Sequence, residues 1–386
     1  MANNNDNKVL NVPPLRFPEF SGEWKMCTIG ELTTKVGSGV TPRGGEAVYK
    51  TEGHPFVRSQ NVGLGNLLLD DIAFIDEETH LRQKNTELQF NDVLLNITGA
   101  SIGRSALVDK QIVGGNVNQH VCIIRTKENL VPSFICSFLL SNYGQRQIDS
   151  FQAGGNRQGL NFEQIKSIKI TIPSKDEQIK IAKLLRAIDE RIATQNKIID
   201  KLQSLIKGLR VCCMQRVYGN NVYLSEIAQI YQPQTISSTE LTEDGFLVYG
   251  ANGIIGKYKD YNHKTEQICI TCRGNTCGMV NYTKPMSWIT GNAMVINTDK
   301  YQDKVYKRYL YHYLSAYNFN SIISGSGQPQ IVRTPLEKLK ITLPTISEQK
   351  QKAMILDKIQ DKIEINHNIL NLYILQKQYL LRQMFI

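Results

Sequence analysis

The chain has 386 residues, of which 41% are hydrophobic and 8% aromatic, and its formal net charge is +10. This length predicts about two to three domains, and the basic excess favours a polyanionic partner, although such an excess is a weak sign alone. The polar start MANNNDNK lacks the apolar core of a signal peptide, and no apolar run is long enough to span a membrane. Eight scattered cysteines without secretion signals indicate reduced thiols in a cytoplasmic protein.

Residues 1–12 are rich in asparagine and nearly free of bulky apolar side chains, which predicts a disordered tail. A first globular domain is then predicted over residues 13–173. Its short apolar runs, separated by Gly- and Asn-rich turns, are typical of strands. We expect these strands at Val93–Thr98, Ser105–Val108 and Val121–Arg125. A helix over Ser133–Asp149 and a strand over Ile168–Ile172 that stops at Pro173 complete this domain.

A helical spacer over residues 174–218 leads to a second globular domain over residues 219–343, and a second helical spacer occupies residues 344–386. The second domain repeats the order of the first: apolar strands, a helix, a Gly-rich loop (SGSGQPQ in place of AGGNRQG) and a last strand that stops before a proline. Its strands and helix are expected at Gln267–Thr271, Ala293–Asn297 and Lys304–Ala316.

The repetition is clearest where each spacer begins. Ile168–Lys183 reads IKITIPSKDEQIKIAK, and Leu339–Met354 reads LKITLPTISEQKQKAM, 171 positions later. A repeat of this length is no solenoid unit and indicates two copies of one module, each a globular domain followed by a long helix. Loop side chains differ greatly between the copies, so the duplication kept a frame and changed a surface.

Both spacers carry heptads of apolar residues, which predict a buried helix–helix seam. Gln195 and Asn366 occupy the same seam position in the two copies, and a polar residue there fixes the register of a helix pair. We expect the two side chains to meet across the contact; a locally exposed seam position is the alternative. The full seam is Ile181, Leu185, Ile188, Ile192, Gln195, Ile199, Leu202, Ile206 and Leu209 in the first spacer, and Lys352, Leu356, Ile359, Ile363, Asn366, Leu370, Tyr373, Lys377 and Leu380 in the second.

This layout predicts the fold class. The second helix must fold back along the first to bury its seam, so the helices are antiparallel and the domains lie at opposite ends of a spacer roughly 64 Å long. We therefore predict an α+β protein in which two similar α/β domains are joined by two long antiparallel coiled-coil helices, with a pseudo-two-fold axis. Duplex DNA also has a local two-fold axis and a turn of roughly 34–36 Å, so two unlike domains on such a spacer suit two unlike half-sites.

Motifs for catalysis are missing from the chain. No P-loop sequence occurs, and Gly37–Gly45 (GSGVTPRGG) does not sit between a strand and a helix in the dinucleotide-binding pattern. Cys269, Cys272 and Cys277 suggest zinc by their spacing, but strand alternation points the first two apart. We interpret them as small buried residues and expect no metal, no bound cofactor and no catalytic residue.

Polar loop residues are the candidate DNA contacts. Arginine pairs well with guanine edges and asparagine or glutamine with adenine edges, while lysine and arginine also hold phosphates. The alternative for each residue is an ordinary solvated loop position. The candidates are Thr41, Arg43, Arg58, Ser59, Gln60, Asn61, Asn118, Gln119, His120, Asn156, Arg157 and Gln158 in the first domain, and Gln232, Gln234, Asn252, Lys257, Arg273, Asn275, Gln328, Gln330 and Arg333 in the second.

Several motifs in this order and spacing point to one family. They are PPLRFPEFSGEWK (Pro13–Lys25), IGEL (Ile29–Leu32), the P-x-x-x-E-Q helix starts at Pro173 and Pro344, VYGANGIIGKY (Val248–Tyr258) and TCRGNTCG (Thr271–Gly278). With them the chain resembles the specificity subunits of Type I restriction-modification systems over its whole length after the tail.

The resemblance implies two target recognition domains, each reading one half of a bipartite sequence in double-stranded DNA. It also implies that the spacers dock two modification subunits, which bind S-adenosylmethionine and methylate adenine. Restriction subunits, which use ATP and Mg for translocation and cleavage, are implied to join this core in defence against foreign DNA. The specificity subunit itself is implied to do no chemistry.

We therefore hypothesise a non-catalytic, sequence-specific DNA-binding subunit that sets the target for methylation and cleavage. Two alternatives stay open: a protein-interaction scaffold that reads no DNA, and a methyltransferase with degenerate motifs. Strongly salt-dependent DNA binding excludes the first, and methylation by the isolated chain favours the second.

The seam assignment predicts the effect of removing its polar pair. Changing Gln195→Leu together with Asn366→Leu should stabilise the helix pair and loosen its register, because polar seam residues specify register at a cost in stability. The melting temperature of the double variant, measured by calorimetry, should rise. A lower melting temperature contradicts the seam assignment.

Overall fold

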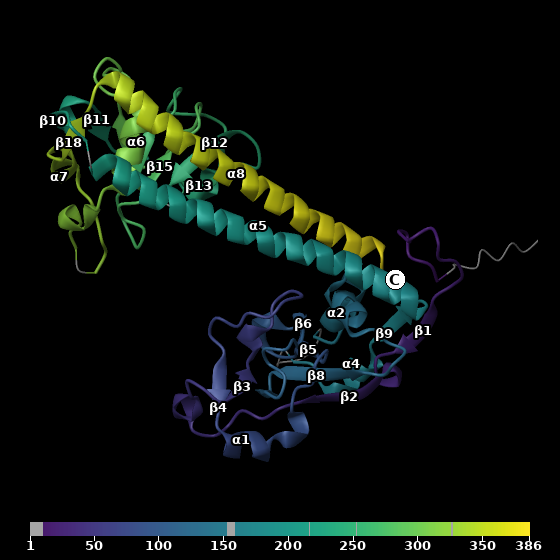
Figure 1. The fold of residues 1–386 in the computed structure, drawn as a ribbon. Coiled ribbons are helices and arrows are strands. Elements are labelled where there is room, and N and C mark those ends of the chain that lie inside the picture. The colour runs from purple at the N-terminus through teal and green to yellow at the C-terminus, as the bar shows by residue number, and fades with distance from the viewer. Residues whose placement is uncertain (1–10, 153–158, 216, 252, 326) are drawn as a thin grey trace, which may run out of the picture. The chain divides into compact units, whose positions relative to one another are not determined.

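The computed structural model describes residues 11–152, 159–215, 217–251, 253–325 and 327–386 (Figure 1). The described residues form two compact units, one within Met1–Gln195 and Ile369–Ile386 and the other within Asn196–Asn368. Helices α5 (Lys175–Gln215) and α8 (Ile346–Gln383) each contribute to both units. Each unit therefore contains one globular domain and part of each long helix.

The first domain contains three small sheets and short helices. A two-stranded antiparallel sheet joins β1 (Lys25–Thr28) to β9 (Lys169–Ile172). A four-stranded antiparallel sheet has the order β2 (Thr33–Ser38), β8 (Val121–Thr126), β5 (Val93–Asn96) and β6 (Ser105–Leu107). The third sheet has the order β4 (Ala73–Ile75), β3 (His54–Val57) and β7 (Asn116–Val117), and its last pair is parallel. The helices are α1 (Glu77–Arg82), α2 (Pro132–Leu140), α3 (Asn142–Ser150) and α4 (Phe162–Ser167).

The second domain has the same topology strand for strand. Strands β10 (Asn220–Tyr223) and β18 (Lys340–Leu343) form the two-stranded sheet. The four-stranded sheet has the order β11 (Gln229–Tyr231), β17 (Ala293–Asn297), β14 (Ile268–Thr271) and β15 (Val280–Tyr282), and the third sheet has the order β13 (Gly253–Tyr258), β12 (Phe246–Gly250) and β16 (Trp288–Ile289), again with a parallel last pair. The helices are α6 (Lys307–Ala316) and α7 (Arg333–Glu337). This correspondence confirms the two similar domains that the repeat predicts.

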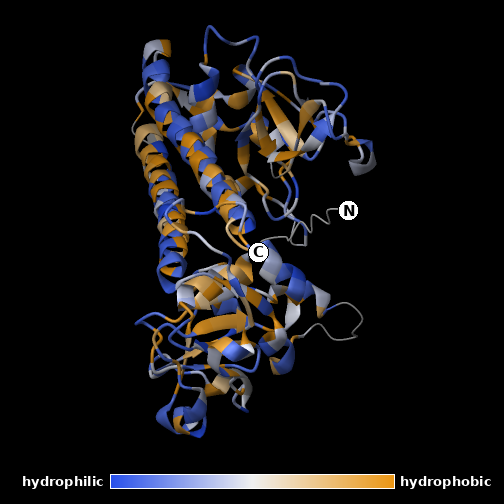
Figure 2. Cartoon of the chain, turned by 90° about the vertical axis from the view of Figure 1, so that its right-hand side faces the viewer, coloured by the Kyte–Doolittle hydropathy of each residue, from blue (hydrophilic) through white to orange (hydrophobic). Residues whose placement is uncertain are grey.

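The central strands are buried on both faces, which explains why they read as continuous apolar runs. In β5, Val93 and Leu95 pack into the core that contains α2 and the long helices, while Leu94 packs into a second core with β3 and β7. Cys269 in β14 and Cys272, which directly follows that strand, likewise belong to different cores, as the strand alternation predicts. Figure 2 shows hydrophobic residues concentrated in the strands of both domains.

The predicted helix over Ser133–Asp149 is wrong in one respect, because two helices, α2 and α3, divide it at Ser141. The Ser141 backbone is extended (φ −73°, ψ 162°), and its hydroxyl donates to the Phe138 carbonyl (2.6 Å) and accepts from the Gly144 N–H (3.3 Å). A Cβ on Gly144 would lie 2.3 Å from the Phe138 carbonyl oxygen. Serine as an N-cap, followed by a glycine that permits close approach, therefore starts a new helix.

The segment before β1 is ordered. The Trp24 N–H donates to the Asn11 carbonyl (2.8 Å), and the Leu15 N–H donates to the Gln383 carbonyl at the end of α8 (3.0 Å). The guanidinium of Arg16 donates two hydrogen bonds to the Glu177 carboxylate, at 2.7 and 2.8 Å. The predicted disordered tail, residues 1–12, is therefore wrong for its last two residues, and residues 1–10 lie outside the described part of the chain.

The two long helices pack antiparallel within each unit, which confirms the predicted helix pair. As the residue number rises along α5, the number of the facing residue on α8 falls. The facing pairs are Asp189 with Lys377 and Arg191 with Tyr373 in the first unit, and Arg210 with Gln360 and Cys213 with Lys352 in the second.

The lysines of the α8 seam each find an oxygen partner. Lys352 donates to the Cys213 carbonyl (2.9 Å) in the last turn of α5, where carbonyls lack intrahelical partners and a positive charge is favoured. Lys377 donates to the Leu64 carbonyl (3.0 Å) and pairs with Asp189 (2.6 Å). The polar seam residues Gln195 and Asn366 are also buried, which excludes the exposed-seam alternative.

The glutamine of each P-x-x-x-E-Q motif fastens a long helix to its own domain. Gln178 accepts from the Val131 N–H (2.9 Å) and donates to two carbonyls, those of Asn129 and Pro173 (both 3.1 Å). Gln349 makes the same three hydrogen bonds in the second domain, at 2.8, 3.2 and 3.0 Å. Both side chains are buried, so the repeated motif is a structural joint.

A polar cluster around the buried His312 joins α6 to both long helices in the second unit. His312 accepts from Arg210 Nε (3.1 Å) and donates from Nε2 to Asp357 (2.8 Å), which also pairs with Arg308. Burial lowers the pKa of His312. Burial alone would raise the pKa of Asp357, but the hydrogen bonds from His312 and Arg308 outweigh it and lower that pKa.

These two pKa shifts predict that acid destabilises the second unit. Both groups bind fewer protons when folded than when unfolded, so stability falls as the pH drops through about 6.5 and again near 4. Between pH 8 and pH 5.5, His312→Gln should remove about 2–4 °C of the fall in melting temperature. His367→Gln on the exposed side of α8 is the matched control. An unchanged pH dependence in His312→Gln would contradict the assignment.

Candidate nucleic-acid interface

Four loops converge around the C-terminal end of β5 in the first domain and of β14 in the second. In the first domain they follow β3, follow β5, precede β8 and precede α4; in the second they follow β12, follow β14, precede β17 and precede α7. The contacts in the first domain are Asn96 Nδ2 to Ser59 O (2.8 Å), Ile97 N to His120 O (3.0 Å) and Leu160 N to Ile97 O (2.9 Å). Those in the second are Thr271 Oγ1 to Ala251 O, Cys272 N to Asn292 O (3.1 Å) and Ile331 N to Cys272 O (3.0 Å).

In the second domain these loops enclose a polar cleft of about 480 Å³. Three residues predicted as DNA contacts, Arg273, Gln328 and Gln330, line it together with Ala251, Gly274 and Asn292. Arg273 and Gln330 form a backbone bridge, and the Gly274 N–H donates to the Pro329 carbonyl (3.0 Å). Two loops that are far apart in sequence are therefore held together by backbone contacts, while the side chains of Arg273, Gln328 and Gln330 are exposed.

The remaining candidates of the second domain lie around this cleft or away from it. Gln232 is adjacent, because its amide donates to the Gly291 carbonyl (3.1 Å) and to Cys272 Sγ (3.2 Å). Asn275 is exposed in the β14–β15 turn, and Gln234 is exposed with its carbonyl bonded to Trp288 Nε1 (3.3 Å). Lys257 pairs with Asp244 (3.5 Å) and Arg333 with Glu337 (2.7 Å). Asn252 lies outside the described residues.

In the first domain Asp71 organises the predicted contact segment 58–61. Its backbone carbonyl accepts from Arg58 Nη2 (2.7 Å), and its carboxylate accepts from Asn61 Nδ2 (2.9 Å) and from Gln60. Asn61 is fully buried, and its amide also donates to the Leu68 carbonyl (2.9 Å). Asn61 therefore shapes the loop, while Arg58 and Gln60 reach solvent.

The other candidates of the first domain divide between buried and exposed positions. Asn118 is buried and accepts from the His120 N–H (3.0 Å), whereas Gln119 is exposed. His120 Nδ1 lies 2.6 Å from the Thr98 hydroxyl. Arg43 is exposed and Thr41 half-buried on the segment after β2. Asn156, Arg157 and Gln158 lie outside the described residues.

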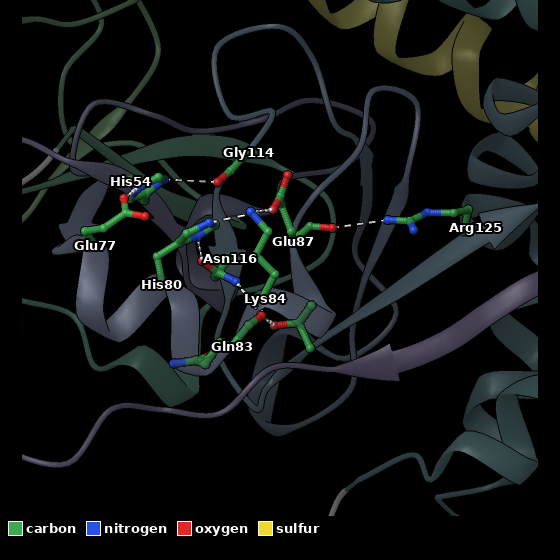
Figure 3. A network of polar contacts seen from close by, with 10 residues as sticks. His54, Glu77, His80, Gln83, Lys84, Glu87, Gly114, Asn116 and Arg125 are labelled. Carbon is green, nitrogen blue, oxygen red and sulfur yellow. Dashed lines mark hydrogen bonds and ion pairs between the residues drawn. The ribbon is translucent and has the colours of Figure 1, made fainter.

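A polar network of two histidines and a glutamate lies beside α1 and was not predicted from the sequence. His54 and His80 stack with ring centroids 3.8 Å apart (Figure 3). His54 Nε2 lies 2.6 Å from Glu77, and this hydrogen bond lowers the pKa of Glu77. His80 Nδ1 lies 2.7 Å from the Asn116 side chain. The network joins α1, β3 and β7, and no regular spacing in the sequence marks it.

Cys269 and Cys272 are buried, as predicted, whereas Cys277 is only half-buried, so the prediction of a buried residue is wrong there. Burial raises the pKa of Cys269 to about 12, so this thiol stays protonated. Cys272 Sγ lies 3.2 Å from the Asn292 carbonyl, as expected for a thiol donor. Within the described ranges no group of three or more His, Cys, Asp or Glu side chains is placed to hold a metal ion.

The family comparison matches this two-domain architecture. A family model for the Type I restriction modification DNA specificity domain matches residues 21–204 and again residues 220–372. The chain belongs to this family. Its members are the non-catalytic targeting subunits of restriction-modification complexes and recognise DNA targets together with modification and restriction subunits. No helix among the described residues is long and apolar enough to cross a membrane.

Individual relatives agree with this assignment. The putative type I restriction enzyme MjaX specificity subunit of Methanocaldococcus jannaschii is 23% identical over 402 residues, which cover 93% of this chain and 92% of the relative. The type I restriction enzyme EcoprrI specificity subunit of Escherichia coli is 32% identical over 147 residues, or 37% of this chain and 36% of the relative. The crystal structure of the S subunit from M. genitalium has the same fold, with a TM-score of 0.65 at 16% identity over 97% of this chain and 99% of that one.

The role of Asp71 predicts a variant that disturbs the contact loop from outside it. Asp71→Ala should lower the free energy of unfolding by about 1–2 kcal/mol, because Asn61 loses one of its partners, and should reduce discrimination between target and unrelated DNA. Competition binding at fixed salt measures that ratio. Asp70→Ala removes the same charge from the neighbouring exposed position and should leave discrimination unchanged; equal effects of the two variants would contradict the positional role.

Proposed function

We propose that this specificity subunit reads a bipartite DNA sequence, with one domain for each half-site, and that α5 and α8 dock two modification subunits. The observation that supports the proposal is the convergence of the same four loops in two domains of identical strand topology, with unlike side chains on those loops. A shared frame with different exposed residues suits two unlike targets, because sequence is read by side chains at base edges.

The partners supply the chemistry in this proposal. Modification subunits bring S-adenosylmethionine for adenine methylation, and restriction subunits bring ATP and Mg for translocation and cleavage. The chain contributes the choice of sequence, and the spacer helices set the distance between the half-sites.

The decisive experiment expresses the full chain with the modification subunit of its own system and maps methylated adenines across a host genome. The expected result is one motif with two specified halves separated by an unspecified gap. A continuous motif, or methylation without sequence preference, would overturn the proposal.

The length of the helices predicts the length of the gap. Inserting one heptad after Gln195 and one after Asn366 keeps the seam in phase and adds about 10 Å to each helix, which corresponds to about three base pairs. The mapped gap should lengthen while both half-sites keep their sequence. The same insertion at the exposed Glu243 turn is the control and should not alter the gap. An unchanged gap in the helix variant would refute the spacer role.

A further inference from the structure

The converging loops define three equivalent positions in the two domains, which we call the frame positions. The first frame position follows β5 or β14 and is Thr98 in the first domain and Arg273 in the second. It forms a backbone bridge with the third frame position, which is Gly159 in the first domain and Gln330 in the second. The second frame position supplies the carbonyl that accepts from the residue preceding the first. It is His120 in the first domain and Asn292 in the second, at 3.0 and 3.1 Å.

The backbones at these positions are alike in further respects. The turn after the first frame position has glycines with positive φ at matching places, Gly99 (+72°) and Gly103 (+85°) in the first domain and Gly274 (+85°) and Gly278 (+90°) in the second. Residues other than glycine are strained in this conformation. The glycines therefore allow the backbone of this turn to follow the same path in both domains. The frame positions therefore hold different side chains at equivalent places.

The side chains of the second domain suit a purine edge. Arg273 is exposed. It lines the 480 Å³ cleft with the amides of Asn292 and Gln330. A guanidinium fork matches O6 and N7 of guanine, and side-chain amides match N6 and N7 of adenine.

The first domain presents a different pattern at the same places. The Thr98 hydroxyl and His120 Nδ1 form a hydrogen bond of 2.6 Å, and Gly159 has no side chain. The first domain therefore offers no arginine or side-chain amide at its frame positions, and its half-site must be read differently there.

We propose that the frame positions determine specificity in each domain, and that Arg273 reads a guanine in the half-site of the second domain. This inference rests on the proposed function above and adds to it the residues and a base. The competing role for an exposed arginine is a phosphate contact, which strengthens binding without reading sequence.

The test uses the full chain with its modification subunit, and the readout is the methylated motif. Arg273→Ala should reduce the preference for one G·C pair in one half-site by about 10- to 100-fold, because a bidentate contact of this kind is lost. The other half-site and the gap should stay unchanged. Lys340→Ala is the matched control, since Lys340 is also an exposed cation of the second domain but lies on β18 in the two-stranded sheet, not on the converging loops; its motif should equal that of the unaltered chain.

A reciprocal variant locates the effect. His120→Ala should relax the opposite half-site and leave the Arg273 half-site intact. If both variants relax the same half-site, or if Arg273→Ala lowers methylation equally at all sites and keeps the motif, the inference is overturned. If the unaltered chain yields no bipartite motif, the proposed function itself fails, so the two failures are distinguishable.

A third variant guards against misfolding. Arg273→Lys keeps the charge and loses the planar fork, so it should retain affinity for unrelated DNA while losing preference for the same G·C pair. Melting temperatures verify that each variant is folded before its motif is interpreted. An intact motif in a folded Arg273→Lys subunit overturns the guanine assignment.

Discussion

The side-chain hydrogen bonds of Gln178 and Gln349 attach each long helix to its domain, and the rest of each domain depends on this attachment. Each buried amide holds the start of a long helix, the proline that ends the preceding strand and the residues leading into α2 or α6. A buried amide that lost these partners would carry the full cost of desolvation, about 1–3 kcal/mol for each unsatisfied group. Three hydrogen bonds therefore define the direction in which each helix leaves its domain, because the apolar packing beside them is non-directional.

The seam of the helix pair is connected to the predicted contact segment of the first domain, residues 58–61. Lys377 on α8 forms an ion pair with Asp189 and donates to the Leu64 carbonyl. Burial raises the pKa of Asp189. Leu64 precedes Asp71, the residue that holds the segment 58–61 in place. A lysine that weakens the apolar seam pattern thus connects the helix pair to the loop that carries Arg58.

The spacing of apolar residues predicts the strands and the spacer helices, because burial imposes a regular spacing on side chains. The repeat follows from the matching residues where the two spacers begin. Apolar spacing did not reveal the break at Ser141, which depends on one hydroxyl and on the space that Gly144 leaves beside Phe138. Composition selected the polar loops but did not separate their roles: Asn61 and Asn118 are buried and hold backbone, whereas Arg273 is exposed. That distinction arises from contacts between residues far apart in sequence, such as Arg273 with Gln330.

The division between frame and exposed side chains explains how one scaffold accommodates two different surfaces. The loops are joined mainly through backbone groups, such as Ile97 and Cys272 N–H, which any non-proline residue supplies. Replacing an exposed side chain such as Arg273 then changes stability by only about 0.5 kcal/mol, whereas replacing Gln349 disturbs the fold. Exposed residues on these loops can therefore change without weakening the hydrogen bonds of Gln178 and Gln349.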